Sequence, residues 1–208
     1  MTSIACVTLE VDDPGAAEHF CTTAFGLAGQ VRLRAAQAPT AGFRGFTLSL
    51  VTSQPGNVDA LFEAAVTAGA TVLKPAAKSL WGYGGVVRAP DGTIWQLASS
   101  SKKDSGPAAR EFDEIVLLLG VEDVKASKRF YVEHGLPVAK SFGGKYVEFE
   151  TGSGPVKLSL YKRRGLAKVA GVSPEGTGSH RLVIGADTGA FTDPDGFAWE
   201  PVSQTASR

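Results

Sequence analysis

Two segments, about a hundred residues apart, combine a tight turn with a residue able to bind a metal or donate a hydrogen bond. The Pro-Asp-Gly sequence at 90–92 precedes Trp95-Gln96, and the same sequence at 194–196 precedes Trp199-Glu200. Proline fixes φ and Asp-Gly favours a turn, so each copy predicts a turn that leads into a strand. Gln96 and Glu200 then face away from the adjacent tryptophan, which we expect to pack in the core. The repeated pattern indicates an internal duplication.

A second set of candidate residues lies in the Gly-rich segment 79–85, which contains Trp81 and Tyr83. Loop aromatics often line ligand clefts, and a rigid ring offers a large contact area to a flat or amphipathic ligand. The alternative is that Trp81 only closes the open end of a sheet. Lys74, Lys78 and Arg88 flank this segment and could bind an anionic ligand, although isolated cations are usually solvated.

Composition excludes several classes of function. The 208 residues carry 21 basic and 21 acidic side chains, which gives no electrostatic reason to expect nucleic acid or a membrane surface as a partner. No apolar run is long enough to span a bilayer, and the N-terminus lacks the pattern of a signal peptide. Cys6 and Cys21 are too few for a disulfide scaffold, so we expect a cytoplasmic protein. Phosphate-binding glycine loops and a serine nucleophile elbow are absent from the sequence.

The order of predicted elements indicates two halves. In the first half, a strand at 4–11 precedes a helix that Asp13 caps and Gly26 ends, and a second helix is predicted at 57–68. The second half repeats the strand and the capped helix from Asp123, but offers no counterpart of the 57–68 helix, and 162–178 is predicted to be a loop. We therefore predict an α+β protein with domains at 1–100 and 111–208, joined by a polar linker at 101–110.

At this point the chain resembles the vicinal-oxygen-chelate superfamily, which includes glyoxalase I, extradiol dioxygenases and bleomycin-resistance proteins. The resemblance implies tandem paired βαβββ modules, here shortened, with each pair curling a sheet around a cavity. The matching motifs follow the family's order along most of the chain: Val7-x-Leu9-x-Val11-x-Asp13 with Phe20, Ala68-Gly69-Ala70, Trp81-Gly82, Ala89-Pro90-Asp91-Gly92, Leu119-x-Val121-x-Asp123 with Ser127 and Phe130-Tyr131, and Asp193-Pro194-Asp195-Gly196.

The resemblance also implies a divalent metal ion, which would be Fe, Ni, Zn or Mn. Its ligand positions map onto Cys6 and Gln96 in the first half and onto His180 and Glu200 in the second, and the remaining positions hold residues that cannot ligate. His180 and Glu200 form the better pair, with Glu200 also the catalytic candidate, but the usual third ligand is missing. The competing interpretations are a backbone-bonded or solvated His180, an ordinary strand carboxylate at Glu200 and a core thiol at Cys6.

Three functions remain open from the sequence. The first is a metal-assisted lyase or dioxygenase of the glyoxalase type that uses His180 and Glu200. The second is a metal-free, resistance-type protein that binds a small molecule with Trp81, Tyr83, Arg88 and Gln96. The third is a non-catalytic interaction module. The incomplete ligand set favours binding, or metal-free chemistry, over classical glyoxalase activity, and the sequence leaves a homodimer open.

Overall fold

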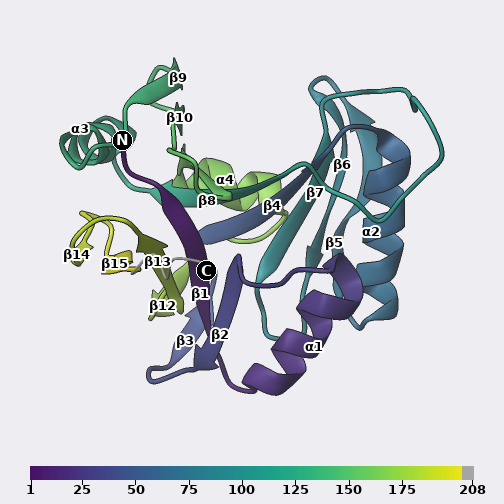
Figure 1. Ribbon diagram of the computed structural model, residues 1–208, viewed down its shortest axis with the longest axis horizontal. Helices are drawn as coiled ribbons and strands as arrows, with labels where there is room; N and C mark the ends of the chain where they lie inside the picture. The colour runs from purple at the N-terminus through teal and green to yellow at the C-terminus, as the bar shows by residue number, and fades with distance from the viewer. Residues whose placement is uncertain (203–208) are drawn as a thin grey trace, which may run out of the picture.

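The computed structural model describes residues 1–202, which form a mixed α+β structure (Figure 1). The helices of this region are α1 (Pro14–Phe25), α2 (Pro55–Thr67), α3 (Val124–Glu133) and α4 (Arg163–Ala170). The strands are β1 (Ile4–Val11), β2 (Val31–Ala35), β3 (Thr40–Gly42), β4 (Phe46–Thr52), β5 (Thr71–Ser79), β6 (Gly82–Arg88), β7 (Ile94–Ser99), β8 (Glu114–Val121), β9 (Val138–Phe142), β10 (Tyr146–Phe149), β11 (Val156–Lys162), β12 (Gly176–Gly178), β13 (Leu182–Ala186), β14 (Phe191–Thr192) and β15 (Ala198–Pro201). None of the helices in the described region is long and apolar enough to cross a membrane.

Two complete βαβββ modules form the centre of the large sheet. One is β4-α2-β5-β6-β7, with its strands in the order β4-β7-β6-β5, and the other is β8-α3-β9-β10-β11, with the order β8-β11-β10-β9. An antiparallel pairing of β4 with β8 joins them. The outer elements are shortened modules: β1 pairs in parallel with β2, and β13 with β15. The α+β class with shortened modules is therefore confirmed.

Strand pairs connect the two halves of the chain directly. Besides the pairing of β4 with β8, β1 lies antiparallel to β13, with Val7 opposite Ile184. The first strand is thus held by a strand near the end of the described chain. The division into domains at 1–100 and 111–208 stays a prediction, and the sheet itself is continuous across the boundary.

The two predicted aspartate caps explain where α1 and α3 begin. Asp13 Oδ1 accepts a hydrogen bond from Ala16 N at 3.0 Å, and Asp123 Oδ1 accepts one from Lys125 N at 2.9 Å. Each aspartate therefore satisfies a backbone donor that the first turn leaves without a helical partner. Gly26 ends α1 in the left-handed conformation at φ 66°, which glycine adopts without steric cost.

The sheet separates two apolar cores. Trp95 and Leu97 belong to the main core, which also contains buried residues of α1, α2 and α3, whereas Ile94 packs in a smaller core with Leu166 of α4. Because neighbouring residues of a strand face opposite sides, α2 and α4 lie on opposite faces of the sheet. Trp95 and Trp199 are buried in the main core, as predicted.

Helix α4 corrects one prediction from the sequence. Residues 163–170 are helical rather than part of a loop. Helix α4 follows the last strand of a complete module, whereas α2 follows the first strand of its module, and no helix follows β13 within the described residues, so the second half lacks a counterpart of α2 there, as predicted. The segment Arg163–Ala170 is short, basic and contains Gly165, all of which obscure its apolar stripe. Leu166, Ala167 and Ala170 are nevertheless completely buried, because the helix packs on β4, β8 and β11.

The predicted linker contains no helix or strand, but side chains of the first half fix its position. Gln54 Oε1 accepts hydrogen bonds from Ser105 N at 2.8 Å and Gly106 N at 2.9 Å. Asn57 Oδ1 accepts another from Ala109 N at 2.9 Å. Gln54 and Asn57 are both buried at the start of α2. The polar composition of this segment suggests a flexible linker, but hydrogen bonds to Gln54 and Asn57 hold the segment against the first half.

Candidate functional site

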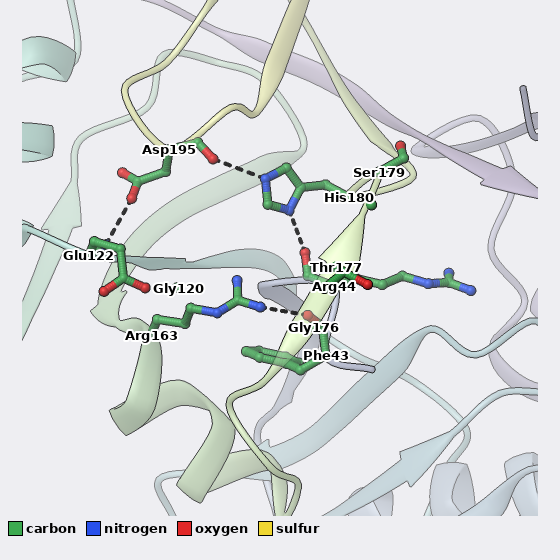
Figure 2. A pocket seen from close by; sticks show the side chains of 11 residues that line it. Phe43, Arg44, Gly120, Glu122, Arg163, Gly176, Thr177, Ser179, His180 and Asp195 are labelled. Carbon is green, nitrogen blue, oxygen red and sulfur yellow. Dashed lines mark hydrogen bonds between the residues drawn. The ribbon is translucent and has the colours of Figure 1, made fainter. Parts of the chain in front are cut away.

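His180 lies where the two halves meet, and both of its ring nitrogens contact backbone carbonyl oxygens (Figure 2). Nδ1 is 2.6 Å from the oxygen of Arg44, and Nε2 is 3.0 Å from the oxygen of Asp195. The ring also stacks on Phe197, with centroids 4.0 Å apart. A metal ligand needs a nitrogen lone pair directed at the ion, and neither nitrogen of His180 has one available in this arrangement. The structure therefore gives His180 the backbone-bonded position.

Glu200 lies elsewhere, near one end of β15, and interacts with arginine. Its Oε1 is 3.3 Å from Arg34 Nη1, and about half of the Glu200 side chain is exposed. Glu200 is opposite Gly185 in the β13–β15 register, five positions beyond His180, so at about 3.3 Å per residue the two are separated by roughly 17 Å. The structure does not bring the two candidate metal ligands together.

The first-half positions are no better as ligands. Gln96 Nε2 donates to Thr47 Oγ1 at 2.8 Å, and Cys6 is buried, which raises the pKa of its thiol. No three histidine, cysteine, aspartate or glutamate residues within 1–202 are grouped so that they could hold a metal ion. The donor set in this part of the chain therefore does not fit the divalent metal that the resemblance implies.

The pocket beside His180 has a volume of about 270 Å³ and a wall of mixed polar and apolar groups (Figure 2). Much of that wall already serves the structure. Arg163 donates from Nη2 to Phe43 O at 2.7 Å and from Nε to Pro174 O at 3.0 Å. Asp195 accepts hydrogen bonds from Glu122 N at 2.8 Å and from the Ser127 hydroxyl at 2.8 Å. These bonds tie loops of both halves together, so the pocket is first of all a structural junction.

A larger cleft of about 650 Å³ lies on the sheet face that carries α4. Its floor is formed by β5, β6 and β7, and Tyr161 and Val169 border it from β11 and α4. This volume lies within the range of about 300–1,000 Å³ that is common for small-molecule sites. The lining residues of the sheet and hairpin are Lys74, Pro75, Ala77, Lys78, Ser79, Trp81, Gly82, Tyr83, Gly84, Gly85, Val86, Gln96, Leu97, Ala98 and Ser99.

A row of three small residues explains why this cleft exists. Ala77 is opposite Gly84 in the β5–β6 pairing, and Gly84 is opposite Ala98 in the β6–β7 pairing. Residues directly opposite each other have side chains on the same face, so the row leaves a hollow where larger side chains would fill the space. The adjacent row of Lys74, Val86 and Gln96 faces the same side. The hollow thus follows from residue size and register together.

The structure places three of the four predicted ligand-binding residues at this cleft. Trp81 is 85% exposed at the tip of the β5–β6 hairpin. Gln96 lies on the floor beside the row of small residues. Tyr83 borders the cleft, but its ring packs against the main core on the other face, where its hydroxyl donates to Asp59 Oδ1 of α2 at 2.7 Å, which raises the Tyr83 pKa to about 12. Arg88 lies apart, near Arg44 and Gly92.

Sequence reasoning missed the residues that border the cleft from the second half. Tyr161 and Val169 are distant in sequence from Trp81, and α4 was not predicted to be a helix. Ala98 was missed because a small side chain carries no chemical signal by itself. The glycines at 82 and 84 were the available signal, since their spacing of two places both on one face of a strand.

Comparison with solved structures identifies the fold. Glyoxalase I from Zea mays superposes with a TM-score of 0.65 over 99% of this chain and 93% of its own, at 15% sequence identity. The chain has the fold of glyoxalase I. A putative dioxygenase from Bacillus subtilis subsp. subtilis str. 168 has a TM-score of 0.62 over 99% of this chain and 86% of its own, at 11% identity. The vicinal-oxygen-chelate resemblance is therefore confirmed at the level of the fold.

Sequence comparison adds no closer relative. No family model matches the chain, and no curated protein matches it in sequence. The glyoxalase fold is thus shared at identities too low to transfer an activity, and function has to be argued from the site.

Proposed function

We propose that this protein binds a small organic molecule without a metal ion, in the cleft between the β5–β6 hairpin, β7 and α4. The observation that supports the proposal is the cleft itself, a hollow of about 650 Å³ with an almost fully exposed Trp81 at its edge. A large exposed aromatic ring beside an apolar hollow leaves contact area that a ligand can cover. Gln96 and Tyr161 add polar groups that can fix the orientation of a bound molecule.

The donor set argues against the metal-assisted lyase or dioxygenase. His180 and Glu200 are engaged in separate interactions, and neither lines the cleft. The described lining contains no histidine, aspartate or glutamate, which are the commonest general bases. Binding is the function that these residues support best.

The test is a titration with N-phenyl-1-naphthylamine, a neutral aromatic probe whose emission rises in an apolar site. Trp81→Ala should weaken binding by about fivefold or more, because aromatic anchors dominate such contacts. Ala98→Leu should weaken it at least as much by filling the hollow. Phe142→Ala is the matched control, since Phe142 is 64% exposed on β9, in the other complete module. Equal affinity in all four proteins would overturn the proposal.

A further inference from the structure

We infer that the ligand of this cleft is an amphipathic organic anion, with an apolar body on the small-residue floor and a negatively charged group at the lysines of β5. This inference rests on the proposed function and adds the chemical class of the ligand. It starts from the charges of the lining. Apart from its tyrosines, the ionisable side chains of the described lining are Lys74 and Lys78. No acidic side chain in that lining neutralises their positive charges.

The position of Lys74 is fixed by the fold. Its Nζ donates to the carbonyl oxygen of Lys168 near the end of α4 at 2.6 Å. An ammonium group has three donors, so two remain after this bond. Lys74 is opposite Val86, which is opposite Gln96, so all three side chains lie on the cleft side of the sheet. The bond to α4 therefore holds a cation beside the apolar floor.

Lys78 adds a second cation at the edge of the cleft. It is exposed and borders the cleft, but its position opposite Tyr83 places its Cβ on the face that carries α2. Because β5 is the edge strand of the sheet, the long, flexible side chain can bend round this edge to a charged group at the opening. Lys78 is three residues and Lys74 seven residues before Trp81 on the same hairpin, so a ring that packs on Trp81 lies nearer to Lys78, and an apolar body on the floor lies nearer to Lys74.

The groups of the floor define the rest of the ligand. Gln96 uses its amide nitrogen for Thr47 and keeps its carbonyl oxygen as an acceptor. Burial raises the pKa of Tyr161, so its hydroxyl stays a neutral donor rather than a second negative charge. Ala77, Gly84 and Ala98 offer no polar side-chain group at all. A flat apolar body with one carboxylate, sulfonate or phosphate group matches this arrangement.

The experiment compares two probes that share the same aromatic skeleton. One is the neutral N-phenyl-1-naphthylamine, and the other is 8-anilinonaphthalene-1-sulfonate, which adds a negative charge. The unmodified protein should bind the sulfonate more tightly. The double variant Lys74→Met/Lys78→Met should lose about tenfold in affinity for the sulfonate, from two exposed charge pairs of ordinary strength. Its affinity for the neutral probe should change by less than about twofold.

A charge-matched control separates local recognition from net charge. Lys125→Met/Lys145→Met removes the same two charges from exposed positions in the other complete module. This variant should bind both probes like the unmodified protein. Salt at about 1 M should weaken only the sulfonate, because the screening length falls to about 3 Å.

The outcomes separate this inference from the proposed function. Equal binding of the two probes, or equal losses in the two double variants, overturns the anion preference and leaves small-molecule binding intact. If neither probe binds, the inference and the proposed function are both overturned. The same holds if binding is unchanged in Trp81→Ala and in Ala98→Leu. Selective loss of the sulfonate in the Lys74/Lys78 variant supports both.

Discussion

His180 illustrates how one residue type fits two different roles. From the sequence, a histidine at the start of a strand was both a candidate metal ligand and a candidate backbone-bonded residue. The sequence could not decide between these roles, because the hydrogen-bond partners are carbonyl oxygens of Arg44, far away in the chain, and of Asp195. Only tertiary structure brings those oxygens to the ring. At this position the ring connects a loop of the first half with the second Pro-Asp-Gly turn.

Replacement of His180 tests this structural role. His180→Ala should lower the free energy of unfolding by about 2 kcal/mol, because the ring's contacts with two part-buried carbonyl oxygens and its stacking on Phe197 disappear. Urea denaturation measures the loss, and His19→Ala, at an exposed position of α1, should change stability by less than about 0.5 kcal/mol. Zinc or nickel content that falls in His180→Ala would instead support a metal-ligand role.

The buried carboxylate of Asp193 gives a second test at this scale, through pH. Asp193 accepts hydrogen bonds from Tyr131 Oη at 2.5 Å and from Phe197 N at 2.8 Å. Burial raises the pKa of Asp193, and the Tyr131 hydrogen bond opposes that rise. Tyr131→Phe removes the opposing bond, so the pKa of Asp193 in the folded protein should rise further.

The pKa of Asp193 is higher in the folded protein than in the unfolded chain, where it is about 3.9. The stability that protonated Asp193 contributes is therefore lost as the pH rises from the unfolded pKa through the folded pKa. Tyr131→Phe should therefore cost about 2 kcal/mol at about pH 7 and clearly less at about pH 4, where Asp193 takes up a proton. Urea midpoints at the two pH values measure the difference. Tyr161→Phe is the control, since the hydroxyl of Tyr161 has no hydrogen bond among the described residues. A cost for Tyr131→Phe that does not depend on pH would contradict this assignment.

At the scale of elements, local signals predicted some segments well and others poorly. The Asp13 and Asp123 caps predicted where α1 and α3 begin, because capping depends on neighbouring residues only. Helix α4 was missed because its stability comes from burial of Leu166 and Ala170 against the sheet rather than from propensity. The cleft was predicted only in part. Trp81 and Gln96 stand in motifs that can be recognised from neighbouring residues, whereas Tyr161 is brought to the cleft only by the tertiary fold.

The segment 101–110, which follows β7 and has no regular secondary structure, can be tested by proteolysis. Gln54 holds this segment through Ser105, Gly106 and the carbonyl oxygen of Pro107. Gln54→Ala should release it, and trypsin should then cleave after Lys102 and Lys103 about tenfold faster, because local opening governs cleavage. Gln37→Ala, at an exposed position whose amide contacts only Ala35 O, serves as the control. Cleavage at an unchanged rate would mean that other contacts hold the segment.

For the whole molecule, the duplicated motifs predicted the fold but not how the halves interlock. Motif order along the chain indicated paired βαβββ modules, and the structural match to glyoxalase I confirms that fold. The pairings of β4 with β8 and of β1 with β13 could not be predicted, because they depend on the register between strands far apart in sequence. Those pairings decide which surfaces of the two halves are buried.

This interlocking predicts cooperative unfolding. Denaturation should give one transition, because separation of the halves would expose both edges of the β4–β8 pairing and one edge of β1. Far-ultraviolet circular dichroism and the fluorescence of buried Trp95 and Trp199 should report the same midpoint, measured in Trp81→Phe to remove the exposed emitter. Two separated transitions would show that the halves unfold independently.

The pairing of β1 with β13 also has a consequence for biosynthesis. A ribosome makes Val7 long before Ile184, the residue that lies opposite it in the sheet. At roughly 5–20 residues per second, the interval is on the order of 10–35 s. Throughout that time the nascent chain carries an apolar strand with one unpaired edge, which is a template for aggregation. Production of this protein in cells should therefore depend on chaperones that occupy the nascent chain until the last strands emerge.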